Sequence, residues 1–298
     1  MQQPNWETFR AVAEVGSISG AARVLNLSQS AVSQKIQQLE DQYGTSLLVR
    51  STQGVRLTAA GEVLYRYVVK LLHTLDEAHD RVRALADERP GPIKVGASLT
   101  IAEYILPGLL TRFYGAELQG RLTVMMANSS AVLDLVASHA VDVGLVEHEI
   151  QRSDIVRRRF LRDVPTLLVH AGHRWAGRTR VSLDEFVHEP LILREPGSGT
   201  RAALEAALAD VGLGVDDLTI SLVLGTTQAI KAMVRDGLGS SVLSPLTVLP
   251  GERGDFWSVE VEELDFARSF YAVHLPLPLS DGARHLISWL TRAGVPAH

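Results

Sequence analysis

Residues 16–62 decide the fold: GSISGAARVLNLSQSAVSQKIQQLEDQYGTSLLVRSTQGVRLTAAGE. Just before them, WETFRAVAEV (residues 6–15) carries apolar residues at helical spacing, and Gly16 marks the expected end of that helix. Ser17 or Ser19 can then begin a second short helix, because serine is a favoured N-cap. The segment therefore opens with two short helices in close succession.

A third helix is expected to begin at Ser28 and to run to about Tyr43, where Gly44 ends it. Asn26 and Leu27 form a tight turn before it. Three short helices with a tight turn between the second and the third predict a helix-turn-helix.

The third helix has two different faces. At ~100° per residue, Val32, Ile36 and Leu39 fall on one side and form the expected core. The other side is polar and almost free of acids, and glutamine and serine side chains suit base edges in the major groove. A solvated face is the alternative, but such faces usually mix Glu and Lys. We therefore predict DNA contacts from this helix, namely from Ser28, Gln29, Ser30, Ser33, Gln34, Lys35 and Gln37.

The segment LLVRSTQGVRLTAAGE (residues 47–62) alternates apolar and polar residues on both sides of a turn at residues 52–54. This pattern predicts a β-hairpin, or wing. Arg50 and Arg56 flank its tip, where we expect them to meet phosphates or the minor groove. Thr58 then begins a new helix.

These residues resemble the N-terminal winged helix-turn-helix of LysR-type transcriptional regulators. The resemblance is dense over residues 6–62 and rests on Ala21-Ala22, Leu27-Ser28-Gln29, Ala31-Val32-Ser33, Leu39-Glu40, Arg50 and Leu57-Thr58-x-x-Gly61. Three positions depart from the family: Ser30 replaces a frequent proline, Gln37 a frequent arginine and Leu48 a frequent phenylalanine. The resemblance implies a regulator that binds double-stranded promoter or operator DNA and a small-molecule effector, and that assembles as a homodimer or homotetramer.

Charge and composition limit the partners. Residues 1–60 carry five basic and four acidic side chains, a weak electrostatic footprint that requires two or more copies on DNA. The 298-residue chain is 46% hydrophobic with a net charge of −5, which argues against nucleic acid along its whole surface. The absence of cysteine excludes disulfides and thiolate chemistry. We expect a cytoplasmic protein without a membrane partner, since no apolar run nears ~20 residues and no secretory signal is present.

From Thr58 to Glu88 the chain lacks proline, and apolar residues recur in steps of three and four. This a/d pattern predicts a coiled coil between two chains. The alternative is a helix packed on its own domain, but ~30 helical residues span ~45 Å, too long for one small domain to cover. Residues 89–92, RPGP, end the helix. The predicted dimerisation residues are Leu64, Val68, Leu71, Leu75, Ala78, Val82 and Leu85.

We therefore expect a DNA-binding domain (1–60), a linker helix (61–90) and an effector-binding domain (91–298). After Pro92, strand-like runs alternate with helical patterns, which predicts an α/β fold with parallel sheets. The family resemblance implies two α/β lobes shaped like periplasmic binding proteins. The first lobe would span about 92–161 and 267–298, the second 162–266, with hinges near 161–165 and 264–268.

Four predicted strand-to-helix junctions are rich in hydroxyls and amides: residues 98–100, 128–130, 195–201 and 226–228. Ligands in such folds sit at strand carboxyl ends, and helix N-termini favour anions. Taken singly, each Ser or Thr is equally well explained as an N-cap. Together with the resemblance, they predict a small, anionic effector held by Ser98, Thr100, Asn128, Ser129, Ser198, Thr200, Thr226 and Thr227.

The segment GSGTRA (197–202) formally matches a dinucleotide-binding fingerprint. The strand after it ends in Gly225-Thr226 rather than in an acid for a ribose, which favours a phosphate- or carboxylate-binding loop. Arg194 or Arg201 could supply its cation.

No nucleophile elbow, H-E-x-x-H or P-loop motif occurs. We expect surface or capping roles for His170 and His173, a solvated loop rather than a metal site at residues 147–149 (EHE), and structural roles for Asp142 and Asp163. We thus expect no catalytic residue, no metal and no cofactor other than the effector. Two alternatives stay open: a binding-protein-fold enzyme, for example one like prephenate dehydratase, with a regulatory helix-turn-helix, and a DNA-bending structural protein without a ligand.

Overall fold

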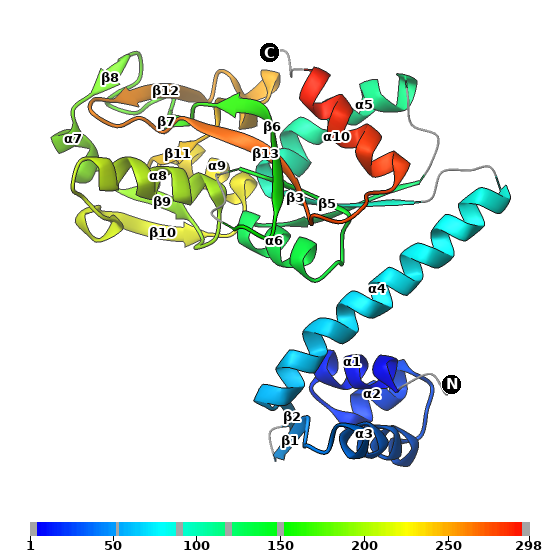
Figure 1. Cartoon of the computed structure of the whole chain (residues 1–298). Helices are drawn as coiled ribbons and strands as arrows, with labels where there is room; N and C mark the ends of the chain where they lie inside the picture. The colour runs from blue at the N-terminus through cyan, green and yellow to red at the C-terminus, as the bar shows by residue number, and fades with distance from the viewer. Residues whose placement is uncertain (1–4, 52–53, 88–91, 117–120, 148–151, 294–298) are drawn as a thin grey trace. The chain divides into compact units, whose positions relative to one another are not determined.

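The computed structural model describes residues 5–51, 54–87, 92–116, 121–147 and 152–293 (Figure 1). The chain divides into two compact units, residues 1–87 and 88–298. In the described ranges, no helix is both long and apolar enough to cross a membrane.

The first unit contains three short helices, a β-hairpin and one long helix. In chain order these are α1 (Trp6–Val15), α2 (Ile18–Val24), α3 (Gln29–Tyr43), β1 (Leu48–Ser51), β2 (Gly54–Leu57) and α4 (Ala59–Asp87). The predicted caps are confirmed: Ser17 accepts from Gly20 N and Ser28 from Ala31 N, both at 3.1 Å. Gly16 and Gly44 end α1 and α3.

The core of this unit is the apolar stripe predicted from the sequence. Val32, Ile36 and Leu39 of α3 are fully buried beside Phe9 and Val12 of α1.

The wing is held in place by Glu40 and Gly61. Glu40 Oε1 accepts from Leu47 N at 2.7 Å and from Leu48 N at 3.2 Å. Gly61 lets α4 approach the same segment, because a Cβ there would lie 2.0 Å from the Leu47 carbonyl oxygen. The Leu39-Glu40 and Leu57-Thr58-x-x-Gly61 motifs therefore fix the wing against the helices.

Helix α4 uses its apolar stripe in two ways. Val68 and Leu72 are buried in the core of the first unit, and Leu64 packs against it. The predicted dimerisation set is therefore wrong in part, because Leu64 and Val68 pack within their own unit. Leu71, Leu75 and Val82 are 38%, 47% and 66% exposed. Ala78 is also exposed, and the side chain of Leu85 lies outside the described residues.

The second unit has two lobes, as the family resemblance implies. The first lobe is a five-stranded sheet in the order β4-β3-β5-β13-β6. Its elements are β3 (Ile93–Ser98), the π-helix η1 (Ile101–Ile105), α5 (Leu106–Ala116), β4 (Leu122–Ala127), α6 (Ser129–Ala137), β5 (Val143–Val146), β6 (Val156–Asp163), β13 (Arg268–His274) and α10 (Asp281–Ala293).

The second lobe holds a four-stranded sheet, β11-β7-β12-β8, and the pair β10-β9. Its elements are β7 (Thr166–His170), β8 (Arg180–Val181), α7 (Leu183–Val187), β9 (Leu191–Arg194), α8 (Gly199–Asp210), η2 (Val215–Asp217), β10 (Ile220–Leu224), α9 (Thr227–Arg235), β11 (Ser241–Leu243), η3 (Pro245–Thr247), η4 (Pro250–Glu252) and β12 (Phe256–Val261).

The prediction of parallel sheets is only half right. Strand β3 runs parallel to β4 and β5, and β9 runs parallel to β10. Strand β13 is antiparallel to β5 and β6, and β7 is antiparallel to β11 and β12. The antiparallel strands arise where the chain crosses between lobes, so strand–helix alternation alone does not reveal them.

Candidate functional site

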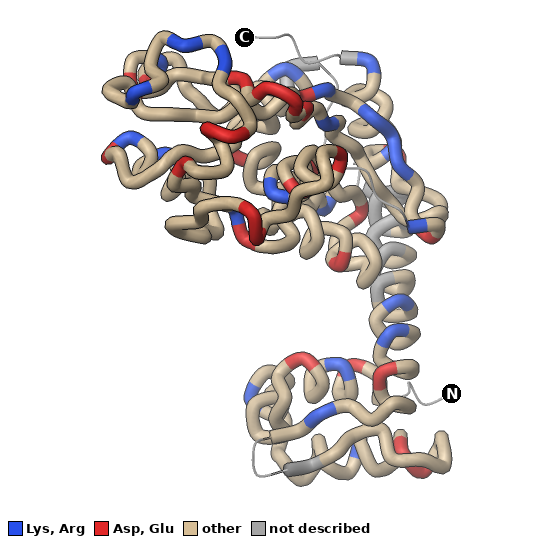
Figure 2. The backbone as a smooth tube through the Cα atoms, turned by 90° about the vertical axis from the view of Figure 1, so that its left-hand side faces the viewer, with Lys and Arg blue, Asp and Glu red and all other residues tan. Residues whose placement is uncertain are grey.

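Helix α3 presents the polar face expected of a recognition helix. Gln29, Ser30, Gln34 and Gln37 are exposed, and Ser33 is half-buried. The side chain of Gln34 makes no hydrogen bond to a described residue, so its amide group can bind a partner. Figure 2 shows only scattered charge in this smaller unit, in keeping with its low net charge.

Three of the other predicted DNA-binding residues already have partners inside the unit. Lys35 Nζ donates to Asn5 Oδ1 at 3.1 Å, which turns this amine toward the N-terminal segment rather than outward. Gln37 Nε2 donates to Asp41 Oδ1 at 2.9 Å. The Ser28 hydroxyl caps α3. Arg56 is exposed on β2, whereas the side chain of Arg50 lies outside the described residues.

In the second unit, a buried ion cluster joins the lobes where the chain crosses between them. Arg268, at the start of β13, donates from Nη1 to Glu147 Oε2 at 2.6 Å and from Nε to Asp163 Oδ2 at 2.8 Å. Thr200 of the second lobe lies 3.0 Å from the same Nη1 and donates to Glu147 Oε2 at 3.1 Å. Ser244, also of the second lobe, donates to Asp163 Oδ1 at 2.7 Å.

Glu147 contradicts the expectation of a solvated loop, since it is only 2% exposed. Burial is the largest influence and would raise the pKa of its carboxyl. The guanidinium groups of Arg268 and Arg194, together with the nearby Ser98 and Thr100 hydroxyls, outweigh burial and hold that pKa below its usual value. His148 and Glu149, the rest of the proposed loop, lie outside the described residues. Sequence reasoning missed this site because the partner, Arg268, is 121 positions away.

The polar side chains at the four junctions divide into three groups. Asn128 and Thr226 are ordinary caps: they accept from Ala131 N at 3.0 Å and from Ala229 N at 3.2 Å. Thr100 and Ser198 also begin helices, but neither side chain makes a capping bond.

Ser98, Thr100 and Ser198 are each at most 2% exposed, and their hydroxyl oxygens have no hydrogen-bond partner among the described residues. We call these three the free hydroxyls. Ser98 and Thr100 lie near the Glu147 carboxylate and help to lower its pKa, but neither makes a hydrogen bond of good geometry with it.

The remaining predicted effector residues serve the protein itself. Ser129 Oγ accepts from Glu147 N at 3.3 Å, and Thr200 joins the ion cluster. Thr227 Oγ1 accepts from Arg194 Nη1 at 3.1 Å. Thr226 is exposed.

The GSGTRA segment brings the lobes together rather than forming an open loop. Ser130 N of the first lobe donates to the Gly197 carbonyl at 3.1 Å. A Cβ on Gly199 would lie 2.4 Å from Glu147 Cβ, so only glycine allows this approach. The two arginines offered as cations are occupied: Arg194 pairs with Glu195 at 2.8 Å and Arg201 with Glu205 at 2.7 Å.

A second contact between the lobes comes from the π-helix. Tyr104 Oη donates to Gln228 Oε1 of α9 at 3.0 Å, and Lys231 Nζ lies 5.1 Å from the Tyr104 ring centroid. Lys231 is itself buried and bonds to Glu252 and the Thr247 carbonyl. Burial and nearby carboxylates raise the pKa of Tyr104 well above its usual value, so this phenol keeps its proton. π-Helical turns often occur at functional sites.

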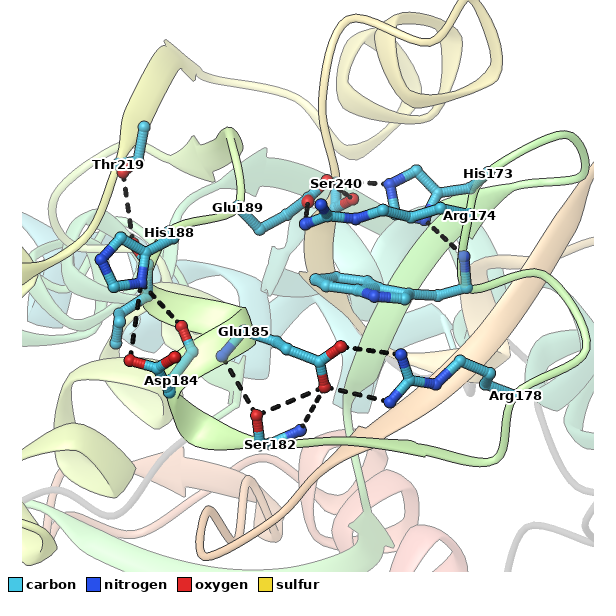
Figure 3. A network of polar contacts seen from close by, with 12 residues as sticks. His173, Arg174, Arg178, Ser182, Asp184, Glu185, His188, Glu189, Thr219 and Ser240 are labelled. Atoms are coloured by element: carbon cyan, nitrogen blue, oxygen red, sulfur yellow. Dashed lines mark hydrogen bonds and ion pairs between the residues drawn. The ribbon is translucent and has the colours of Figure 1, made fainter.

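His173 does more than cap a turn. Its Nδ1 accepts from Trp175 N at 3.2 Å, a capping role as predicted, but its Nε2 lies 3.0 Å from the buried Glu189 carboxylate (Figure 3). Arg174 and Ser240 bind the same carboxylate. Burial lowers the pKa of His173, so its ring is neutral near pH 7. The serine and histidine both contact the glutamate and not each other, which is not a nucleophile arrangement.

Two family models match the chain. Residues 5–62 match the bacterial regulatory helix-turn-helix protein, lysR family, and residues 86–294 match the LysR substrate binding domain. An uncharacterized HTH-type transcriptional regulator of Mycobacterium tuberculosis is 33% identical over 96% of this chain and 95% of its own.

Two solved structures share the fold. Full-length CbnR complexed with its target DNA has a TM-score of 0.70 at 20% identity, covering 99% of this chain and 100% of that chain. The CcmR regulatory domain of Synechocystis PCC6803, solved in complex with 2-PG, has a TM-score of 0.62 at 23% identity, covering 68% of this chain and 97% of that chain. Together with the family models and the full-length relative, they leave one conclusion: the chain belongs to the LysR family of bacterial transcriptional regulators.

Proposed function

We propose that this regulator binds operator DNA through α3 and the wing, and that a small anion held between the lobes of the second unit modulates this binding. The observation that carries the proposal is the free hydroxyls, Ser98, Thr100 and Ser198, which are buried and without a partner among the described residues. Leaving a buried hydroxyl unsatisfied costs about 1–3 kcal/mol, so native proteins rarely do so without a function.

Two helix starts favour an anion here, against the one net negative charge of a cluster that has two carboxylates and one guanidinium. The N-terminal ends of α6 and α8 meet here, since a Cβ on Gly199 would lie 3.0 Å from Ser129 Oγ. Backbone N–H groups at helix starts favour negative charge. Arg268 adds a buried donor: its Nη2 lies 2.8 Å from Asp163 Oδ2, yet makes no hydrogen bond with the described residues. The 2-PG complex of the related CcmR domain is consistent with a small effector in this fold.

For DNA, the proposal assigns base contacts to Gln34 and Ser33 and phosphate contacts to the exposed Arg56. CbnR, which shares the fold, has been solved with its target DNA. Because Lys35 and Gln37 already hold partners within the unit, they have at most a supporting part.

We further propose that the chain works as a homo-oligomer. The exposed stripe of α4 from Leu71 onward suits pairing with a second copy. Two edge strands of the second unit also expose apolar side chains, Met125 and Met126 on β4 and Leu222 and Val223 on β10. Pairing would join two weakly charged DNA-binding units on one operator, in the cytoplasm.

A regulator without catalysis is favoured over a binding-protein-fold enzyme. Three carboxylates near the predicted effector residues are all paired: Glu147 and Asp163 with Arg268, and Glu195 with Arg194. A paired carboxylate is poorly placed to act as a general base.

The test of effector binding is a thermal-shift screen against small carboxylates and phosphates, followed by titration of the best hit. Thr100→Val and Ser98→Ala should each raise the Kd about tenfold, since a hydrogen bond to a charged group is worth about 1.5–3 kcal/mol. Thr111→Val, which changes an exposed hydroxyl on α5, is the matched control and should leave the Kd unchanged. Equal affinity in all three variants would refute the assignment.

The test of DNA recognition is fluorescence anisotropy with a footprinted operator and its single-base variants. Gln34→Ala should cost about 1–3 kcal/mol at one base pair and relax the preference there. Gln42→Ala, which removes an exposed glutamine from the last turn of α3, should change no preference. If the two variants behave alike, α3 does not read bases through Gln34.

A further inference from the structure

The first lobe contains a pocket away from the ion cluster. Its volume is about 270 Å³, and it lies between the strands β6 and β13 and the helix α10. Arg158 and His274 contribute from the strands, and Arg284, Ser288 and Ile287 from the helix. None of the described lining residues is acidic.

The pocket lies at the far end of the sheet from the ion cluster. Strands β6 and β13 are antiparallel, pairing Arg268 with Asp163 at one end and His274 with Val156 at the other. Arg158 precedes Asp163 by five positions, and His274 follows Arg268 by six. At ~3.3 Å per residue, the strand positions that line the pocket are therefore about 15–20 Å from the ion cluster, so the two sites are separate.

The side chains of the pocket are arranged for an anion. Arg284, Ser288 and Thr291 recur at helical spacing and thus share one face of α10. Arg158 is exposed and makes no ion pair with a described residue. Among the described residues, Arg284 is paired with Asp281 of its own helix alone, an exposed pair of low energy. Ile287 and Leu279 give the pocket an apolar wall.

The strand itself adds positive potential. Residues 156–163 read VRRRFLRD, and the arginines at 157, 158, 159 and 162 are exposed. Residues 157–159 are consecutive arginines, and blue segments follow one edge of the larger unit (Figure 2). The acid of this strand, Asp163, is buried in the ion cluster and cannot offset them at the surface.

We propose that this pocket is a second binding site, for an organic anion with a carboxylate or phosphate head and a small apolar body. The head lies between the guanidinium groups of Arg158 and Arg284, with a hydrogen bond from Ser288, and the body lies against Ile287 and Leu279. This site is independent of the effector site in the cleft.

Arginines on an edge strand also have another role, because charge discourages pairing with a foreign sheet. The two roles make different predictions about Arg159. Arg159 is equally exposed on the same strand but does not line the pocket. If the arginines only prevent pairing with a foreign sheet, Arg158 and Arg159 are equivalent. An anion site needs Arg158 and not Arg159.

The experiment is a ³¹P NMR titration of the full chain with phenyl phosphate, with phenol as the uncharged comparison in calorimetry. Arg158→Ala and Arg284→Ala should each raise the Kd for phenyl phosphate about tenfold or more, and Arg159→Ala less than twofold. Asp281→Asn, which removes the carboxylate competing for Arg284, should tighten binding. Phenol should bind no better to the wild-type protein than to Arg158→Ala.

Three outcomes would overturn the proposal: no saturable binding, equal losses in the Arg158 and Arg159 variants, or binding abolished by Ser98→Ala. The last result would place the anion in the cleft, and would leave the proposed effector site standing. Conversely, if Ser98→Ala and Thr100→Val do not change the Kd for any effector, the phenyl phosphate titration still tests this pocket.

Discussion

Hydroxyl groups that begin helices behave differently in the two units of the chain. In the DNA-binding unit, Ser17, Ser28 and Thr58 each accept a backbone N–H of the helix that they begin. In the effector-binding unit, Thr226 and Ser182 cap their helices in the same way, whereas the buried hydroxyls of Thr100 and Ser198 make no capping bond. The difference is therefore confined to two positions of the second unit, which are the ones that we propose for ligand contacts.

The two units also differ in where their charged side chains lie. The first unit keeps its charges near the surface, whereas the second buries Arg268 with Glu147 and Asp163. Burying an ion pair stabilises little by itself, but it makes the lobe arrangement depend on each member. This cluster therefore spans both lobes beside the hydroxyls of Ser98 and Thr100.

The largest expected effect comes from breaking this cluster. Arg268→Met leaves two buried carboxylates without their cation and should destabilise the second unit by about 3–5 kcal/mol, measured by urea denaturation. Arg180→Met, which breaks an exposed ion pair with Glu260, is the matched control and should cost at most about 1 kcal/mol. Comparable losses in both variants would mean that the cluster is not effectively buried.

Acidification is expected to have a smaller effect on the stability of the second unit. Because the pKa of Glu147 is lower in the folded chain than in the unfolded chain, its contribution is fully present above the unfolded value and is lost as pH falls through the folded value. The melting temperature of the second unit should therefore fall below about pH 4.5, and less steeply in Glu147→Gln. If the melting temperatures of the wild type and of Glu147→Gln fall equally steeply with decreasing pH, this assignment is contradicted.

The sequence predicts the first unit better than the second, for a physical reason. Helices α1 to α3 are specified by local caps and by an apolar stripe within one segment, so spacing alone locates them. Strand β6 is not predicted, because VRRRFLRD lacks the alternation of a half-buried strand, and neither are β8, β12 and α7. The free hydroxyls are on the predicted effector list, but the pattern cannot separate them from caps such as Thr226, since that depends on three-dimensional partners.

The ion cluster shows the same limit. Glu147 lies in a charged run, EHE, which is typical of a solvated loop, and Asp163 follows a run of arginines. Their burial depends on Arg268, which the chain brings back only after building the whole second lobe. Nothing in the sequence of residues 145–165 predicts the contact with Arg268.

The most direct test of the central claim is one thermal-unfolding experiment on Ser28→Ala and Ser198→Ala, with and without the best small-anion hit. Ser28→Ala removes a cap and should lower the stability of its unit by about 0.5–2 kcal/mol while keeping the full ligand-induced rise in melting temperature. Ser198→Ala removes no bond to a described residue, so it should keep its stability without ligand and lose most of that rise. Equal ligand-induced rises in the two variants would contradict the account.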